Sequence, residues 1–274
     1  MTYLPVDGIE TYYETPRGLP AGEGQAFVLL IHGAGGSSRH WQPLLAHLSE
    51  RVYPILIDLP GHGRSSGTVL RSVDDAVTFL DHFLTLLGVE QPIGCAGHSL
   101  GGLIAQRLAM LFPPRLARLV LIATSARIRL HSDFLEAALT GCWNLETLRK
   151  SFGPGVPRDV QNLVLNEFPK TRVAKGSSDF MGLSNCELHP KLSALSIPTL
   201  IVVGDDDVII SPRHSRFLHQ RLPHSILLLL SGGGHYVHVE QPNLVADALN
   251  RFIVPSGKRD ASHPWLDGNS VDRS

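Results

Sequence analysis

Five short apolar runs, rich in Leu, Ile and Val, recur along the chain with turn-forming residues at their ends. Their hydrophobicity is continuous rather than alternating, which is typical of strands that are covered on both faces of a parallel sheet. Pro54 lies inside the second run and predicts a bulge or a late start of that strand. The predicted strands are residues 27–31, 52–57, 119–122, 200–203 and 226–230.

Between these runs, apolar residues recur at helical spacing, most clearly over residues 73–87. Ser72 stands at the N-cap position of this segment, and Gly88 follows it as a stop signal. The same spacing predicts helices over residues 103–111 and 244–252. Alternating strands and helices predict an α/β fold, in which a twisted, mostly parallel sheet carries helices on both faces.

Three regions depart from this alternation. The Asp7-Gly8 pair between two short β-type runs predicts an antiparallel hairpin at the sheet edge. No strand pattern appears between about Thr124 and Pro198, and a bare loop of about seventy residues would be unusual. We therefore predict a core formed by residues 1–124 and 198–254, and a helical cap inserted at 125–197. The polar residues 255–274 predict a loose tail.

Composition narrows the function classes. The 274 residues are 43% hydrophobic, enough for a sizeable core, and their net charge is −1 without a long single-sign run. This balance disfavours nucleic acid and anionic membranes as partners. The N-terminus lacks a secretion signal and no apolar run is long enough to span a bilayer, so we expect a cytoplasmic protein; its oligomeric state is not indicated.

The three cysteines, Cys95, Cys142 and Cys186, are odd in number and widely spaced. This spacing fits neither a disulfide framework nor a zinc site, so we expect reduced thiols and no metal. Cys95 lies in an apolar run and is interpreted as a small core residue.

The sharpest chemical signal is at residues 97–101, which read Gly-His-Ser-Leu-Gly and stand between an apolar run and a predicted helix. This is the G-x-S-x-G pattern of a tight strand-to-helix turn that projects a serine hydroxyl above a sheet. A serine needs a histidine base and an orienting carboxylate to become nucleophilic. Candidates follow in that chain order, each after a predicted strand: the acids of residues 205–207, then His235.

Together these segments resemble the α/β-hydrolase superfamily, specifically an esterase-like branch related to enol-lactone hydrolases and the methyl-ester carboxylesterase of biotin synthesis. The resemblance covers residues 25–253 and rests on residues 30–36, 58–65, 97–102, 198–207 and 234–242.

The resemblance implies roles for five residues and no cofactor. Ser99 matches the nucleophile and His235 the base. Asp207 matches the acid, because in the family pattern the acid stands three residues after the strand-ending glycine. The oxyanion hole would use the backbone N–H groups of Leu100 and Ala34, although Gly33 or Gly35 also stands in the same loop.

Other polar residues near these motifs have structural interpretations. We expect His32 to support its loop, His62 to belong to a turn, and Asp58 to anchor the turn at residues 61–63. His98 is adjacent to the serine but is expected not to face it. His235 and His238 lack further ligands for a metal.

These observations predict a serine hydrolase that cleaves an ester, lactone or thioester with a small to medium, mostly apolar acyl group. The same three residues also serve cofactor-free haloperoxidases or perhydrolases and C–C bond hydrolases in relatives, so these activities stay open. A ligand-sensing module without turnover is a further alternative, because one fold hosts many functions.

Overall fold

The computed structural model describes residues 2–19, 25–129, 132–173 and 186–254. Within these residues, eight strands form one sheet in the order β1-β2-β4-β3-β5-β6-β7-β8. Neighbouring strands from β4 to β8 pair in parallel, which confirms the predicted mostly parallel sheet. The strands are β1 (Thr2–Val6), β2 (Ile9–Glu14), β3 (Ala26–Ile31), β4 (Val52–Ile57), β5 (Ile93–His98), β6 (Leu116–Ile122), β7 (Thr199–Gly204) and β8 (Ser225–Leu230).

Strands β1 and β2 form the predicted antiparallel hairpin at one edge of the sheet, where Val6 pairs with Ile9. The turn between them places Asp7 at φ 48° and Gly8 at φ 78°, in the left-handed region that Asp and Gly tolerate best. The short local signal was therefore sufficient to predict this part of the fold.

The prediction at Pro54 was wrong. Strand β4 begins at Val52 and runs through Pro54 in unbroken register with β3, without a bulge. Its pairing with β2 involves only Leu56 and Ile57. Among the described residues, the side of β4 away from β3 therefore has no strand partner at Pro54, and a residue without an N–H is accommodated there.

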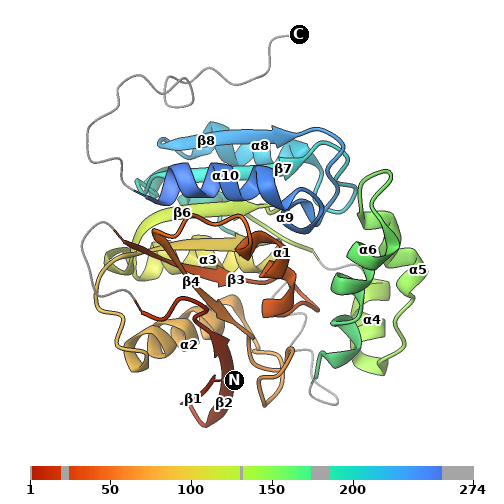
Figure 1. Ribbon diagram of the computed structural model, residues 1–274, viewed down its shortest axis with the longest axis horizontal. Coiled ribbons are helices and arrows are strands. Elements are labelled where there is room, and N and C mark those ends of the chain that lie inside the picture. Colours follow the sequence, from red (N-terminus) through yellow and green to blue (C-terminus); the bar gives the residue numbers. More distant parts are fainter. Residues whose placement is uncertain (1, 20–24, 130–131, 174–185, 255–274) are drawn as a thin grey trace.

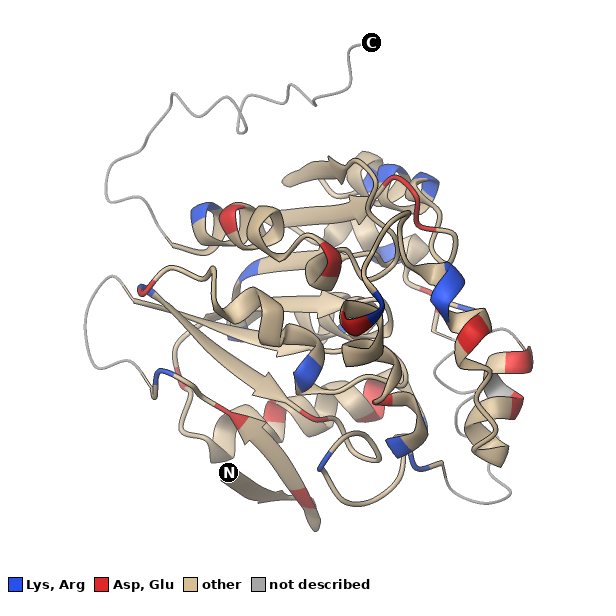
Figure 2. Cartoon of the chain, turned by 45° about the vertical axis from the view of Figure 1, so that its right-hand side comes forward, with Lys and Arg blue, Asp and Glu red and all other residues tan. Residues whose placement is uncertain are grey.

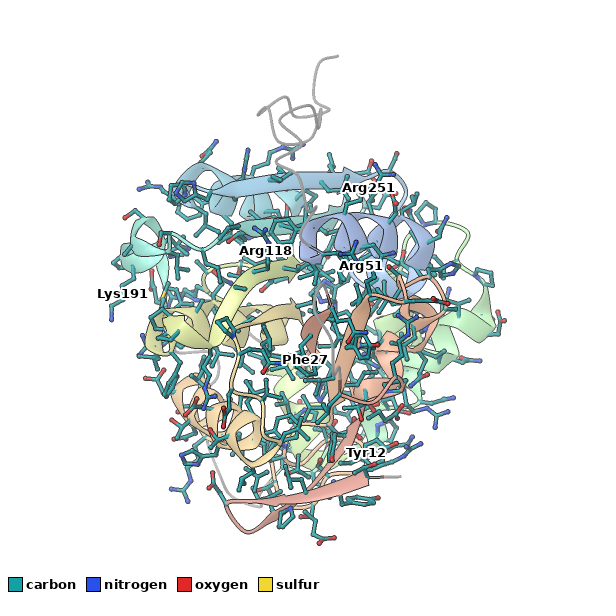
Figure 3. All side chains as sticks on the ribbon, turned by 60° about the vertical axis from the view of Figure 1, so that its left-hand side comes forward. Tyr12, Phe27, Arg51, Arg118, Lys191 and Arg251 are labelled. Atoms are coloured by element: carbon teal, nitrogen blue, oxygen red, sulfur yellow. The ribbon has the colours of Figure 1, made fainter. Side chains whose placement is uncertain are left out.

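Helices cover both faces of the sheet (Figure 1). Side chains of β3 alternate between them: Leu29 and Ile31 pack into one apolar core, and Val28 and Leu30 into the other. The first core includes α2 (Val73–Leu86), α3 (Leu100–Leu111) and α8 (Pro212–Arg221), and the second includes α1 (Gln42–Leu45), α9 (Val237–Glu240) and α10 (Pro242–Ile253). Figure 3 shows the side chains between the sheet and its helices and labels Phe27.

The ends of α2 follow the prediction. Ser72 is the N-cap, and its hydroxyl accepts a hydrogen bond from the Asp75 N–H at 3.0 Å. Asp74 and Asp75 occupy the first turn, where carboxylates interact favourably with the positive end of the helix dipole. The helix reaches Leu86, and Gly88 follows at φ 75°.

The segment between β6 and β7 carries α4 (Ser132–Thr140), α5 (Leu145–Leu148) and α6 (Arg158–Leu165), and no strand among its described residues. These helices lie beside the core, at the carboxyl ends of the parallel strands (Figure 1). We propose that residues 125–197 act as a cap over this edge. Residues 174–185 of this segment, and the tail predicted at 255–274, lie outside the described residues.

Acidic and basic residues are interspersed along the chain, as Figure 2 shows. Among the described residues, no helix has the length and apolar character needed to cross a membrane.

Candidate active site

Ser99 lies at the sharp turn between β5 and α3. Its backbone has φ 51° and ψ −117°, a conformation that residues with a side chain rarely adopt. The conformation is held by hydrogen bonds from Ser99 N–H to Ile122 O at 2.9 Å and from Thr124 Oγ1 to Ser99 O at 2.6 Å. Strained backbone of this kind costs about 1–3 kcal/mol and concentrates at functional sites.

The glycines of the motif are required by close backbone approach. A Cβ atom at Gly97 would overlap the carbonyl group of Gly101. A Cβ atom at Gly101 would in turn overlap the carbonyl of Ile31 at the end of β3. Strands β3 and β5 and helix α3 therefore meet too closely for any side chain, and this packing presents Ser99 at the carboxyl edge of the sheet.

The structure brings the three predicted side chains together. Nε2 of His235 lies 3.1 Å from Ser99 Oγ, and its Nδ1 lies 2.9 Å from Oδ2 of Asp207. A carboxylate only accepts hydrogen bonds, so Nδ1 carries the proton toward Asp207, and Nε2 is left to accept from the Ser99 hydroxyl. Asp207 and His235 are buried, whereas Ser99 is partly exposed and accessible.

Asp207 is distinguished from its neighbours by burial and hydrogen bonding. Its Oδ1 accepts from the N–H groups of Ile209 and Ile210 at 2.8 and 2.9 Å, and this orients Oδ2 toward His235. Asp205 and Asp206 are exposed. Asp205 instead accepts a hydrogen bond from Gly232 N–H at 2.6 Å, which ties the ends of β7 and β8 together.

The loop after β3 lies directly beside Ser99. A Cβ atom added at Gly33 would stand 3.2 Å from Ser99 Cβ. Ala34, the next residue, is partly exposed, and Leu100 opens α3, where the first N–H groups of a helix have no partner within the helix. These two predicted amide donors therefore belong to segments that border the serine.

The segment between β6 and β7 that we propose as a cap, called the cap segment below, also contacts this loop. The ring of Phe168 is so close to Gly35 that an added Cβ would lie 2.5 Å from its Cδ1. Ser37 Oγ donates to the buried Glu167 carboxylate at 2.8 Å, and Glu167 also pairs with Lys170 at 2.6 Å. The Gly33–Ser37 loop is thus packed between the core and the segment 152–170.

Three neighbouring polar residues have the structural roles predicted for them. Nδ1–H of His32 donates to Gly33 O at 2.8 Å and its Nε2 accepts from Leu59 N–H at 3.0 Å, while His62 bonds Pro60 O within its own turn. Burial lowers the pKa of both imidazoles to about 3, so they are neutral at pH 7. The carboxylate of Asp58 accepts from Ser38 N–H at 2.6 Å and Arg64 N–H at 2.8 Å, which anchors the turn.

Sequence reasoning missed the part played by Glu240. Its carboxylate accepts hydrogen bonds from the N–H groups of Gly234 and Tyr236, at 2.8 and 3.0 Å, on either side of His235. It also accepts from Gly153 N–H of the cap segment at 3.0 Å. Burial raises the pKa of Glu240, while these three N–H groups act in the opposite direction. The Glu-Gln-Pro sequence after His235 was part of the family resemblance, but it did not indicate which N–H groups bind the Glu240 carboxylate.

The mostly parallel eight-stranded sheet with its helices is the α/β-hydrolase fold. The chain belongs to the alpha/beta hydrolase family, whose model matches residues 28–248, and it is therefore a hydrolytic enzyme of that class. This confirms the resemblance stated from the sequence.

The chain is similar in sequence to several named proteins. YugF, an uncharacterized hydrolase of Bacillus subtilis, is 26% identical over 266 residues, covering 90% of this chain and 96% of that protein. The 3-oxoadipate enol-lactonase 2 of Acinetobacter baylyi is 29% identical over 82% of this chain and 88% of its own length. The pimeloyl-acyl-carrier-protein methyl ester esterase of Legionella pneumophila is 28% identical over 85% and 96%.

Solved structures show the same fold. The chain superposes on a thermophilic esterase from Thermogutta terrifontis with a TM-score of 0.78 and 23% identity, covering 91% of this chain and 96% of that one. For the enol-lactonase of Burkholderia xenovorans, the TM-score is 0.80 at 20% identity, covering 93% and 100%.

Proposed function

We propose that the protein is a serine hydrolase that cleaves a carboxylic ester, or a related lactone or thioester, through an acyl-enzyme. The observation that carries the proposal is the unbroken hydrogen-bonded chain from Asp207 through His235 to Ser99. Two of the named relatives, an enol-lactonase and a methyl ester esterase, are consistent with this chemistry.

In the proposed reaction, Ser99 Oγ attacks the carbonyl carbon while Nε2 of His235 takes the hydroxyl proton. The negative charge that develops on the carbonyl oxygen is stabilised by the N–H groups of Ala34 and Leu100. His235 gives its proton to the departing alcohol, leaving Ser99 acylated. Water then attacks the carbonyl carbon of the acyl group while His235 takes a proton from the water. His235 passes this proton to Ser99 Oγ as the bond to the acyl group breaks, and the carboxylic acid leaves. Asp207 holds the imidazole in the required tautomer and favours its protonated form.

The cap favours an apolar acyl group. The rings of Phe134, Trp143 and Phe168 contact one another edge to face, with centroids 5.1 to 6.0 Å apart. Phe168 in turn packs on Gly35, in the loop proposed to hold the carbonyl oxygen. A small to medium, mostly uncharged acyl group is the substrate that such surroundings suit.

The test is turnover of p-nitrophenyl butyrate by Ser99→Ala. We expect kcat to fall by about five to six orders of magnitude, because removal of a serine nucleophile abolishes covalent catalysis. Ser231→Ala, which truncates an exposed serine, is the control and should retain wild-type turnover. A fluorophosphonate probe should label Ser99 in the wild type, as located by peptide mass spectrometry. Ester turnover retained by Ser99→Ala would overturn the proposal.

A further inference from the structure

His98 connects the strand that carries Ser99 to the backbone of His235. Its side chain is 1% exposed, and its Nε2 lies 2.9 Å from the carbonyl oxygen of His235. Because a carbonyl only accepts, Nε2–H of His98 is the donor. The N–H of His235 donates at 2.7 Å to Ser151 O. Both backbone groups of His235 are therefore held, one from β5 and one from the cap segment.

The ring of His98 is itself fixed by packing. It lies in a buried column of rings in which successive centroids are 4.6 Å apart for Trp41 and His238, 4.4 Å for His238 and His98, and 4.8 Å for His98 and His235. At its edge, a Cβ added to Gly33 would stand 2.8 Å from Nδ1 of His98. The imidazole has little room to tilt, so its hydrogen bond to His235 has a fixed direction.

His98 also stays uncharged beside His235. Burial, followed by the neighbouring imidazoles of His238 and His235, lowers the pKa of His98 well below its usual value. A neutral ring at this position does not oppose the positive charge that His235 acquires when it takes a proton from the serine. A permanent cation here would disfavour that step.

We propose that His98 is a positioning residue for His235: by holding the His235 carbonyl, it keeps the imidazole in place between Asp207 and Ser99. This inference rests on the proposed function, because it assigns His235 the role of base. His98 does not face Ser99, as the sequence analysis expected; its hydrogen-bond partner is the backbone of the base.

The chain offers a matched set of substitutions. His98→Gln places an amide N–H the same number of bonds from Cα as Nε2, whereas His98→Phe keeps a ring and removes the donor. His98→Asn carries an amide that is one bond too short to reach. We expect Phe and Asn to lower kcat for p-nitrophenyl butyrate by about 10- to 100-fold with KM little changed, because a displaced base weakens only the reacting geometry. Gln should restore most of the lost kcat.

His238→Phe is the control, because neither ring nitrogen of His238 has a hydrogen-bond partner in the part of the chain that is described. It keeps an aromatic ring in the same column, so the packing against His98 is retained and kcat should equal that of the wild type. A second measurement is the low-field proton NMR signal of the His235 Nδ1–H bound to Asp207. It should be sharp in the wild type, His98→Gln and His238→Phe, and broadened or shifted in His98→Phe and His98→Asn.

The outcomes separate the two proposals. If the probe fails to label Ser99 in the wild type, the proposed function itself is wrong. If Ser99 is labelled, and if His98→Phe and His98→Asn have the kcat and the Nδ1–H signal of the wild type, His98 has no positioning role. An equal loss in His238→Phe would attribute the effect to ring packing and would also overturn the inference. If His98→Phe does not fold, the comparison of Asn with Gln decides.

Discussion

The carboxylate of Glu240, at the end of α9, accepts a hydrogen bond from the backbone N–H of Gly153, 87 residues earlier in the chain. The two segments are in such close contact that a Cβ at Gly153 would overlap the carbonyl of Gly232. The loop that carries His235 is therefore held partly by the segment between β6 and β7, and the partly buried carboxylate of Glu240 joins the two.

We expect Glu240→Gln to destabilise the protein and to lower activity. The amide nitrogen of glutamine would face at least one of the three backbone N–H groups that now donate to the carboxylate. An N–H left without an acceptor costs about 1–3 kcal/mol, and two of these groups flank His235. Urea unfolding and ester turnover, measured on the same preparation, check both effects.

Glu50→Gln is the matched control, because it makes the same chemical change at an exposed site. It should leave the free energy of unfolding and kcat within error of the wild type. Equal stability of the Glu240 and Glu50 variants would show that the partly buried Glu240 carboxylate does not hold these segments together.

The glycines of β5 provide a second test. Gly97→Ala places a methyl group on the Gly101 carbonyl of α3, and backbone cannot move aside without displacing Ser99. We expect loss of ester turnover and a stability loss of several kcal/mol, above the usual 1–3 kcal/mol for overpacking. Thermal unfolding and turnover measure the two effects.

Gly94→Ala, on the same strand, is the control. Its added methyl group would lie 2.6 Å from Cδ1 of Ile253, the end of a flexible side chain that can rotate away. Turnover by this variant should be close to that of the wild type. If both alanine variants behave alike, close backbone approach is not what the motif requires of Gly97.

The features that the sequence predicted correctly have local signals. The apolar runs predicted parallel strands, Asp7-Gly8 predicted the hairpin, and Ser72 predicted the start of α2. Each of these features depends on residues that are close together in the chain. The failure at Pro54 has a different origin. Whether a strand tolerates proline depends on its neighbours in the sheet. The residues of β4 alone do not show that β2 pairs with only part of this strand.

The supports of the candidate site could not be predicted in the same way. His98 and His235 are 137 residues apart, and no periodicity or spacing connects a ring on β5 with a carbonyl after β8. The choice among the acids at 205–207 likewise depended on a family resemblance, since only burial and the Ile209 and Ile210 N–H groups distinguish Asp207 physically. Contacts of this kind are set by tertiary packing.

Buried neutral histidines make stability dependent on pH. Burial lowers the pKa of His32 and His62 to about 3 and that of His40 to about 4, from about 6.5 in the unfolded chain. Between these pKa values the unfolded chain binds more protons than the folded protein does. The contribution of these histidines to the free energy of unfolding is therefore fully present above pH 6.5 and is lost as the pH falls toward 3–4. Each group contributes a slope of up to about 1.4 kcal/mol per pH unit. Urea unfolding from pH 8 to pH 5 should show this loss.

His62→Asn tests one contribution, because the asparagine amide replaces the Nδ1–H donor to Pro60 O and cannot be protonated in this range. We expect a slope that is smaller by up to about 1.4 kcal/mol per pH unit. His47→Gln, at an exposed histidine, should leave the slope unchanged. Stability that is constant from pH 6.5 to pH 5 would show that these rings are not held neutral by burial.

The acids at 206 and 207 give the sharpest prediction about the chemistry, because they are adjacent in sequence and differ in environment. Asp207→Asn would present an amide to Nδ1 of His235, and the amide nitrogen would donate where the carboxylate accepts, which favours the tautomer with the proton on Nε2. That proton would face Ser99 Oγ, so the imidazole could no longer take the hydroxyl proton. We expect kcat for p-nitrophenyl butyrate to fall by about 10⁴-fold with the fold retained, whereas Asp206→Asn, at an exposed carboxylate, should turn over like the wild type. A larger loss of kcat in Asp206→Asn than in Asp207→Asn would assign the role of the acid to Asp206. It would also require His235 to leave the position in which it contacts Ser99.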